Sequence, residues 1–336
     1  VTGAGGFIGS WVVKRLLENG YYVHGTVRNK KKNQHLFDIP LAKDNLELFE
    51  ADLLVEGSFD NAFKGCSGVF HTASPFFFSG VTDPDNQMLK PAVEGTLSVM
   101  RSVCRTKSVK RVIVTSSLAA VIVGNYSADH TFTENDWSDP DLQRSAKMWY
   151  LLSKNLAERS LWDFYNQLSD SEKHFTLAVV NPGMVVGPLL QPTLNTSSEL
   201  ILKLFNGSRD SYPHAYMFFV DVRDVADSHI AVFEDNNAKG RFLCVSCGVT
   251  YKDVCDVLHK LSKNIEGMKI PDHVKGFKPG EIPSYEPSGF KNFSNDKLKA
   301  LGIIFRELDE MVEETTKSLI EKNLFILNSS KTHKSS

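Results

Sequence analysis

Three glycines near the start of the chain constrain its fold more than any other feature. Gly3, Gly6 and Gly9 recur at every third residue, and the helical pattern 11–20 and the apolar run 21–27 follow them. Glycines at this spacing permit a tight turn, close packing of a helix on a strand and close approach of backbone amides to a phosphate. The chain therefore opens with the glycine turn, helix and strand of a nucleotide-binding βαβ unit.

Apolar runs that predict short strands alternate with helical patterns through roughly the first half of the chain. These runs are 22–27, 46–50, 68–71, 111–116 and 176–181. The alternation predicts an α/β fold, a doubly wound parallel sheet (Rossmann) with helices on both faces. After residue 188 proline and glycine accumulate and the pattern loosens, which predicts a smaller C-terminal substrate lobe.

The same pattern sets the expected domain boundaries. We assign residues 1–187 to the Rossmann domain, with a return segment at about 216–246, and residues 188–215 and 247–325 to the substrate lobe. The polar stretch 326–336 predicts a disordered tail. Because the chain begins almost at the glycine turn, we expect most of the first strand and any targeting segment to lie outside this sequence.

Composition excludes several classes of protein. The 336-residue chain carries a formal net charge of -2 and no basic stripe with interleaved aromatic residues, so we expect no nucleic-acid partner. The longest apolar stretch, 112–124, is too short to span a bilayer, so no membrane partner is expected. Five irregularly spaced cysteines favour a reducing compartment, the cytoplasm. Cys244 and Cys247 fall on opposite faces of a predicted strand, and no metal site is expected. Nothing in the pattern sets the oligomeric state.

A phenol and an ammonium lie four residues apart on a strongly helical segment. Tyr150 and Lys154 share one face of a helix that is expected to continue to about Gln167. A lysine in that place stabilises tyrosinate, and a positively charged nicotinamide ring nearby would lower the pKa of Tyr150 further, from about 10 towards neutrality. Such a tyrosine exchanges a proton with a substrate oxygen near pH 7. The buried run 111–116 delivers Ser116 and Ser117 to the carboxyl end of a strand, where open parallel sheets bind ligands.

Glycine turn, serine, tyrosine and lysine in this order resemble the extended short-chain dehydrogenase/reductases. Four stretches are similar to the plant-type branch, which contains dihydroflavonol reductases, cinnamoyl-CoA reductases and cinnamyl-alcohol-dehydrogenase-like aldehyde reductases. They are 69–75, 134–139, 149–158 and 181–188, and the similarity extends over roughly residues 1 to 325. The resemblance implies an NADP-dependent reductase that acts on a small-molecule carbonyl, with an alcohol as the product.

The resemblance also implies roles for individual residues. Tyr150 is the expected proton donor, Lys154 lowers its pKa and hydrogen-bonds the nicotinamide ribose, and Ser117 holds the substrate oxygen. Ser116 is the rival for the serine role, but the second serine of the family's Thr-Ser-Ser pattern falls on Ser117. The cofactor contacts expected from the glycine turn and by similarity are Gly3, Gly6, Phe7, Ile8, Gly9, Asp52, Leu53, Thr72, Ala73, Ser74, Tyr150, Lys154, Pro182, Gly183, Met184, Val185 and Ser197.

Cofactor choice is predicted from the end of the second strand. Folds that select NAD carry an acid there for the ribose 2′-hydroxyl, whereas this chain has Arg28 followed by three lysines. A guanidinium donates two parallel hydrogen bonds to a phosphate, so the sequence predicts NADPH over NADH. By similarity the pair that contacts the 2′-phosphate is Arg28 and Lys32.

Residues expected to contact substrate depart from the relatives. Dihydroflavonol reductases carry an asparagine five positions beyond the catalytic serine, where this chain has Ile122, and the surroundings of Tyr150 differ from those of cinnamoyl-CoA reductases. Phe76, Phe77 and Phe78 line an apolar pocket or belong to the core, and Leu189 is a further candidate. We therefore expect an apolar or aromatic, phenylpropanoid-like aldehyde or ketone. The alternatives are dihydroflavonol or cinnamoyl-CoA reduction, a sugar-nucleotide epimerase or dehydratase, and a non-catalytic NADPH-binding regulator.

Overall fold

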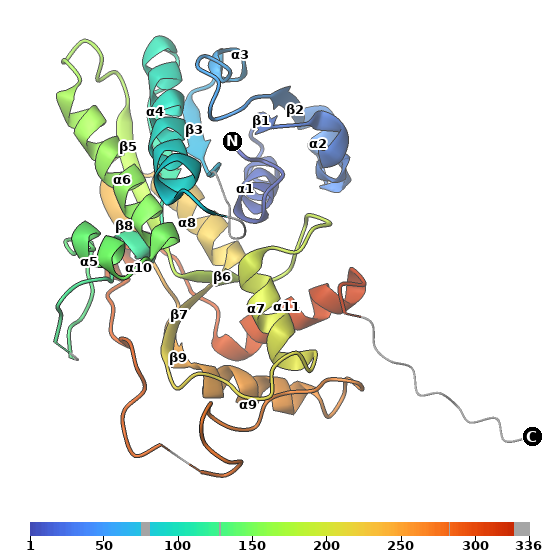
Figure 1. Cartoon of the computed structure of the whole chain (residues 1–336). Helices are drawn as coiled ribbons and strands as arrows, with labels where there is room; N and C mark the ends of the chain where they lie inside the picture. The colour runs from blue at the N-terminus through green and yellow to red at the C-terminus, as the bar shows by residue number, and fades with distance from the viewer. Residues whose placement is uncertain (75–80, 128, 282, 326–336) are drawn as a thin grey trace, which may run out of the picture.

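Helices alternate with strands along most of the chain in the computed structural model (Figure 1), which describes residues 1–74, 81–127, 129–281 and 283–325. The helices and strands are α1 (Phe7–Glu18), β1 (Val23–Val27), η1 (Lys30–Asp38), α2 (Ala42–Asn45), β2 (Leu46–Glu50), α3 (Asp60–Phe63), β3 (Gly68–His71), η2 (Asp85–Leu89), α4 (Lys90–Arg105), β4 (Arg111–Thr115), η3 (Leu118–Ala120), α5 (Pro140–Ser145), α6 (Trp149–Gln167), β5 (Thr176–Pro182), β6 (Met184–Val186), α7 (Thr196–Phe205), β7 (Tyr216–Asp221), α8 (Val222–Glu234), β8 (Gly240–Cys244), β9 (Cys247–Thr250), α9 (Tyr251–Leu261), α10 (Asp296–Ala300) and α11 (Leu308–Glu321).

The main sheet is parallel throughout its named strands. β1 pairs with β2, and β3, β4, β5 and β8 pair in that order. Thr2 forms β-bridges to both Thr26 and His71, and so joins the two groups of strands. Parallel strands bring their carboxyl ends to one edge, which is where the ends of β1, β3, β4 and β5 meet. The predicted parallel α/β sheet is confirmed.

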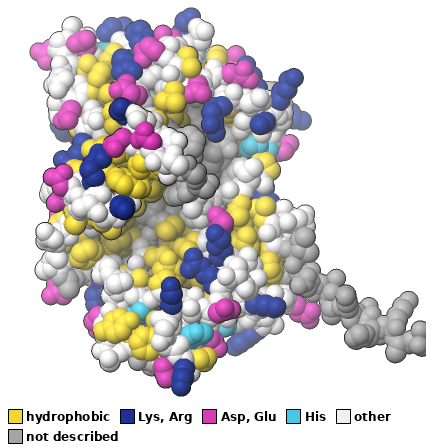
Figure 2. Space-filling view, viewed as in Figure 1, with side chains coloured by type: hydrophobic (Ala, Val, Ile, Leu, Met, Phe, Trp, Pro, Cys, Tyr) yellow, Lys and Arg dark blue, Asp and Glu magenta, His cyan; other side chains and the backbone are white. Residues whose placement is uncertain are grey.

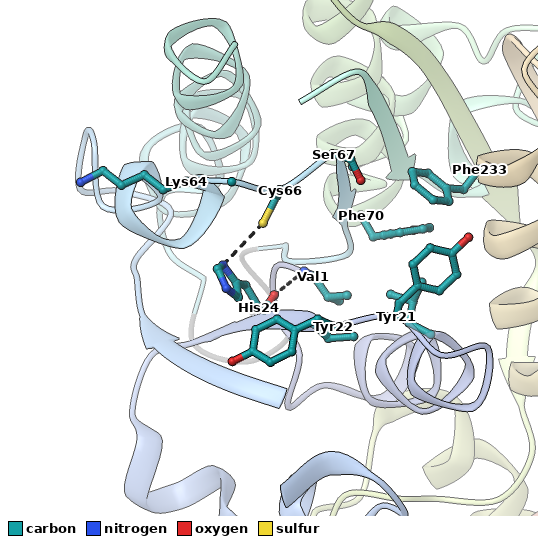
Figure 3. A pocket seen from close by; sticks show the side chains of 13 residues that line it. Val1, Tyr21, Tyr22, His24, Lys64, Cys66, Ser67, Phe70 and Phe233 are labelled. Atoms are coloured by element: carbon teal, nitrogen blue, oxygen red, sulfur yellow. Dashed lines mark hydrogen bonds between the residues drawn. The ribbon is translucent and has the colours of Figure 1, made fainter. Parts of the chain in front are cut away.

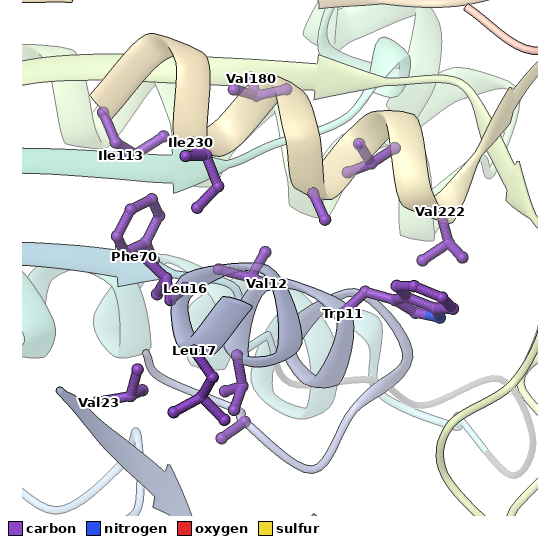
Figure 4. Packing of buried hydrophobic residues seen from close by; sticks show 14 of the residues in the cluster. Trp11, Val12, Leu16, Leu17, Val23, Phe70, Ile113, Val180, Val222 and Ile230 are labelled. Atoms are coloured by element: carbon purple, nitrogen blue, oxygen red, sulfur yellow. The ribbon is translucent and has the colours of Figure 1, made fainter. Parts of the chain in front are cut away.

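Alternate residues of the strands enter different cores because side chains of a strand alternate between its faces. Phe70, Ile113 and Val180 pack against α1 and α8 (Figure 4). Their neighbours Val112 and Val179 pack with α4 and α6 on the other face. α1 lies beside α8 and α4 beside α6 (Figure 1). The strands β3, β4 and β5 are therefore buried on both faces.

The smaller lobe has its own sheet and core. β6 pairs in parallel with β7, and β7 pairs antiparallel with β9. A separate apolar cluster, which includes Ile201, Leu258 and Met311, joins α7, α9 and α11 to these strands. Within the expected return segment 216–246, α8 packs on the main domain and β8 joins the main sheet, whereas β7 belongs to the lobe. β6 also pairs in the lobe's sheet, although it lies within the expected Rossmann segment 1–187. The boundary is predicted from composition, which does not indicate which strands pair by hydrogen bonds.

Figure 2 shows the molecule hollowed between its upper and lower parts, with hydrophobic side chains gathered around the hollow and charges of both signs mixed over the surrounding surface. Among the helices of the described residues, none is long and apolar enough to cross a bilayer. All five cysteines are unpaired. Cys244 ends β8 and Cys247 begins β9, so the two lie in different sheets.

Candidate active site

Tyr150 and Lys154 occupy the first two turns of α6, which runs to the predicted Gln167. Both side chains are partly buried. Burial raises the pKa of Tyr150 to about 12, because the charged phenolate loses its hydration. Burial also lowers the pKa of Lys154 to about 8, and the carboxylate of Glu158 acts in the opposite direction. Burial alone accounts for the raised pKa of Tyr150 in the protein without cofactor, so the fall towards neutrality expected beside a nicotinamide ring stays a prediction.

The two serines after β4 have different environments. The hydroxyl of Ser116 is buried and donates to Glu158 Oε2 at 2.6 Å. Ser117 is partly exposed, and its Oγ accepts a hydrogen bond of 3.1 Å from the Ala119 amide at the start of η3. Accepting that bond leaves the Ser117 hydroxyl proton available for a ligand. This geometry supports Ser117 as the serine that holds a substrate oxygen.

The glycine turn packs against the turn that follows β3. Gly3 has a φ of +66°, and a Cβ on Gly9 would lie 2.2 Å from Gly3 O and 2.8 Å from Thr72 Oγ1. Ala73 lies against Gly3 and donates its amide to Thr2 Oγ1 at 3.2 Å. Neither glycine tolerates a side chain, because the two turns are in contact. Ser74 follows on the same turn and is partly buried.

The start of α1 has the chemistry of a phosphate site. Gly6 is its exposed N-cap, no side chain caps the helix, and its first turn, which holds Phe7 and Ile8, contains no acidic residue. Backbone amides at such a helix start bind anions through hydrogen bonds and the helix dipole. Asn33 of η1 lies directly over this turn and leaves no room for a Cβ on Gly5. The sequence did not predict the position of Asn33, because no local pattern indicates that η1 lies over the glycine turn.

Arg28 and Lys32 lie beyond the carboxyl end of β1, and both side chains are exposed. Within the described residues, no hydrogen bond or ion pair engages the Arg28 guanidinium, whereas the Lys32 amide donates to Asn29 Oδ1 at 3.1 Å. A free guanidinium beside the glycine turn suits a phosphate ester. Taken together, this guanidinium, the uncapped helix and the glycine turn fit an NADP molecule.

The other expected cofactor residues are distributed around the same edge. Asp52 is exposed and accepts from the Leu54 amide at 2.9 Å, while Leu53 packs over Gly95 of α4. Pro182 ends β5 and Gly183 has no room for a Cβ, since Phe218 O would lie 2.5 Å away. Met184 and Val185 continue into β6. The 182–185 segment thus connects β5 of the main sheet to β6 of the smaller sheet.

Ser197 has a defined structural contact. Its hydroxyl donates to Val185 O and its Oγ accepts from Asn195 Nδ2 at 2.8 Å, which ties the start of α7 to β6. The buried oxygens Asn195 Oδ1 and Gln191 Oε1 have no hydrogen-bond partner among the described residues. A buried polar atom without a hydrogen bond lowers the stability of the fold. The two oxygens are therefore available to accept hydrogen bonds from a polar ligand.

The substrate candidates divide into three cases. Phe76, Phe77 and Phe78 lie outside the described residues. Ile122 is partly buried and packs against the cluster around Phe132 and Phe218. Leu189 is 4% exposed in the core of the smaller lobe, so little of its side chain is open to a ligand.

Two buried histidines are core residues. His71 Nδ1 lies 2.8 Å from Thr2 Oγ1, and burial lowers its pKa to about 3. His229 lies 2.7 Å from Thr115 Oγ1, and burial lowers its pKa to about 4. Both are neutral near pH 7. Among the described residues, no group of three or more histidine, cysteine and carboxylate side chains is placed to hold a metal ion.

A separate cavity of about 380 Å³ lies at the amino-terminal edge of the sheet (Figure 3). Val1, His24, Cys66 and Phe70 contribute to its lining. The Val1 amine donates to His24 O at 2.7 Å, and Cys66 Sγ lies 3.5 Å from His24 Nδ1. This cavity is distinct from the candidate active site, because Ser117 lies beyond the opposite ends of the strands.

A family model described as the NAD dependent epimerase/dehydratase family matches residues 1–245. The chain belongs to this family. The cinnamoyl-CoA reductase CAD2 of Medicago truncatula is 40% identical over 327 residues, which cover 96% of this chain and 95% of that relative. A dihydroflavonol 4-reductase of Gerbera hybrida is 38% identical over 342 residues, which cover 99% of this chain and 88% of that relative.

Solved structures agree with this family membership. Gre2 of Candida albicans in complex with NADPH matches with a TM-score of 0.83 and 33% identity, over 96% of this chain and 98% of that one. The resemblance to the extended short-chain dehydrogenase/reductases and to their reductase branch is confirmed.

Proposed function

We propose that this protein is an NADPH-dependent reductase that converts an aldehyde or ketone to its alcohol. The observation that carries the proposal is the meeting of three features at one edge of the sheet. Tyr150 and Lys154 on α6 and the available hydroxyl of Ser117 lie at the edge where the glycine turn and α1 leave amides open to a phosphate. The related reductases and the NADPH-bound neighbour support this assignment.

When bound, NADPH would supply the hydride for the carbonyl carbon. Tyr150 donates its proton to the carbonyl oxygen, and its high pKa keeps the phenol protonated at neutral pH. The Ser117 hydroxyl donates a hydrogen bond to the same oxygen and so stabilises the charge that develops there. Lys154 holds the nicotinamide ribose and stabilises the tyrosinate left after proton transfer.

Arg28 and Lys32, whose side chains are exposed beyond the end of β1, would select NADPH by contacting its 2′-phosphate. The glycine turn, the Thr72–Ser74 turn and the 182–185 segment would contact the rest of the cofactor. The unpaired oxygens of Gln191 and Asn195 offer acceptors near Ser197. These assignments are part of the proposal.

The proposed substrate is a medium-sized, apolar or aromatic carbonyl compound. Ile122 offers apolar area and no hydrogen bond, and it is continuous with an aromatic cluster that includes Tyr126 and Phe290. A reducing compartment such as the cytoplasm fits five unpaired cysteines. Dihydroflavonol and cinnamoyl-CoA reduction stay as alternatives, since relatives at about the same identity carry those names.

NADPH oxidation measured over a panel of aldehydes, ketones, acyl-CoA esters and sugar nucleotides tests the function. We expect turnover with apolar aldehydes or ketones and its loss in Tyr150→Phe. NADPH binding without turnover on any carbonyl would indicate the regulator instead. Conversion of a sugar nucleotide without net cofactor consumption would indicate an epimerase or dehydratase.

A further inference from the structure

A buried carboxylate lies one helical turn beyond Lys154. Glu158 is 2% exposed on α6, and its two oxygens accept four hydrogen bonds. Ser116 Oγ donates at 2.6 Å, Asn181 Nδ2 at 2.7 Å and Arg241 Nε at 2.7 Å, with Trp162 Nε1 at 3.3 Å. A buried charge is tolerated only where it is paired and hydrogen-bonded in this way. No step of the proposed mechanism uses this buried carboxylate.

Arg241 of β8, which forms an ion pair with Glu158, donates hydrogen bonds from all three of its guanidinium nitrogens. It is 6% exposed, and its other nitrogens donate to the backbone oxygens of Glu134, Asp136 and Ala120. Its guanidinium lies 3.9 Å from the ring centroid of Trp137. The segment 134–139 therefore encloses the cation. Because Arg241 is held by these contacts, its ion pair with Glu158 orients the carboxylate.

Glu158 connects the elements that carry the candidate catalytic residues. Asn181 Nδ2, at the end of β5, donates both to Glu158 and, at 3.2 Å, to Ser117 O. Ser116, the neighbour of Ser117, donates to the same carboxylate. Lys154 and Glu158 also line one small cavity of about 20 Å³. A single side chain thus links α6 to the ends of β4 and β5.

We propose that Glu158 is a positioning residue, which keeps Lys154 in its ammonium form and holds α6 against the strand ends that carry Ser117 and Asn181. The inference rests on the proposed function, since it assigns Lys154 its catalytic role. An ammonium in a water-poor site is retained only if a nearby anion opposes the cost of its desolvation. Glu158 is the group that raises the pKa of Lys154 in the described part of the chain.

Other titratable groups around Lys154 do not supply that anion. From β3, His71 is neutral, and from α8, His229 is neutral and reaches the site only through Thr115. From β8, Arg241 is a cation already paired with Glu158. Lys297 of α10, a further cation, donates to Arg241 O.

Charged residues of α4, which packs on α6, face outward. Lys90 donates to Asn86, Glu94 pairs with Arg101, and Arg105 pairs with Asp60. These groups are largely exposed, so water and salt screen their effect on Lys154. Removal of the Glu158 charge is therefore the direct test.

Glu158→Gln keeps the side-chain size and removes the charge. Selective ¹³C labelling of lysine, with Lys154→Arg to assign the signal, reports the pKa of Lys154 without any need for turnover. We expect that pKa to fall by about one unit in Glu158→Gln, the size of effect that a close charge produces. Asp163→Asn, which removes an exposed carboxylate from the same helix, should leave the pKa unchanged.

Steady-state kinetics supply a second readout. The ratio of variant to wild-type kcat should fall by about fivefold or more between about pH 6.5 and about pH 8.5, because the variant loses its ammonium at lower pH. A loss of activity equal at both pH values, with an unmoved Lys154 pKa, would show that Glu158 is only a structural spacer and overturn the proposal.

A folding defect does not prevent the test. If Glu158→Gln does not fold, Glu158→Asp retains the charge but withdraws it from Lys154, and the pKa of Lys154 should fall by about 0.3 unit or more. An unmoved pKa there overturns the proposal as well. Absence of reductase activity in the wild-type protein refutes the proposed function alone, because the lysine titration is independent of turnover.

Discussion

Ser116 donates a hydrogen bond of 2.6 Å to the buried carboxylate of Glu158. Because of this contact the Ser116 hydroxyl points into the protein interior. The local sequence does not distinguish Ser116 from the adjacent Ser117. Ser117, one residue further, keeps its hydroxyl proton for a ligand. The pair therefore separates a serine with a structural contact from the proposed catalytic serine.

Substitution of each serine by alanine tests this division. Ser117→Ala should lower kcat by about 10²-fold with little loss of stability, because it removes a donor to the developing oxyanion. Ser116→Ala should lower the free energy of unfolding by about 1.5 to 3 kcal/mol, because it removes a hydrogen bond to a buried charge. Turnover and urea denaturation of both variants provide the comparison. A larger kcat loss in Ser116→Ala would reverse the assignment.

Tyr150→Phe should bind NADPH normally and turn over at least about 10²-fold more slowly, because the variant lacks the proton donor. Binding should persist because the proposed phosphate site is the glycine turn at the start of α1. Fluorescence titration with NADPH and steady-state turnover measure the two effects separately. Near-full turnover in this variant would mean that another group donates the proton.

Arg28→Ala should erase most of the preference for NADPH over NADH. Loss of a charged, bidentate contact costs roughly 1.5 to 3 kcal/mol, or about 10- to 150-fold in NADPH affinity. NADH affinity should change little, because NADH has no 2′-phosphate. Lys64→Ala, which removes an exposed lysine at the other edge of the sheet, is the matched control. Equal affinity of the wild-type protein for both cofactors would refute the assignment.

Buried neutral histidines should make the protein less stable in acid. Burial lowers the pKa of His229 to about 4, whereas an unfolded histidine titrates near 6.5. As the pH falls from about 6.5 to about 4, the unfolded chain gains a proton that the folded protein does not bind, so the free energy of unfolding decreases. The stability that neutral His229 contributes is present above about pH 6.5 and is lost progressively below it.

His229→Gln should therefore be less stable than wild type near pH 7, and this difference should shrink by about 1 to 2 kcal/mol near pH 5. Urea denaturation at the two pH values measures the change. His259→Gln, on the exposed side of α9, should show a constant difference. An unchanged gap for His229→Gln would mean that His229 titrates normally in the folded state.

An apolar aldehyde, such as phenylacetaldehyde or cinnamaldehyde, should have a higher kcat/KM than a dihydroflavonol or cinnamoyl-CoA. Ile122 cannot pair the hydroxyls of a flavonoid, and each buried unpaired polar group costs about 1 to 3 kcal/mol. Apolar area removed from water contributes roughly 25 cal/mol per Å² instead. A dihydroflavonol or acyl-CoA ester better by about tenfold, or roughly 1.4 kcal/mol, would refute this view of the pocket but not the reductase function.

Local pattern determined much of this protein. The strands Leu46–Glu50 and Gly68–His71 and the helix that carries Tyr150 lie where the sequence predicts them. Strand and helix periodicity, the glycine turn and the i, i+4 spacing of Tyr150 and Lys154 are properties of neighbouring residues, so they are visible without a fold. The parallel sheet follows from their alternation along the chain.

Tertiary structure alone decided what depends on distant residues or on burial. Glu158 and Arg241 are separated by 83 residues, and only the pairing of β8 with β5 brings them together. The raised pKa of Tyr150 in the protein without cofactor was not predicted, because spacing reveals the adjacent lysine but not the loss of water around the phenol. β6 and β7 belong to the smaller sheet, because strand pairing depends on which strands the fold brings side by side and not on their order in the sequence. Desolvation and long-range pairing are properties of the packed molecule, and no short stretch of sequence encodes them.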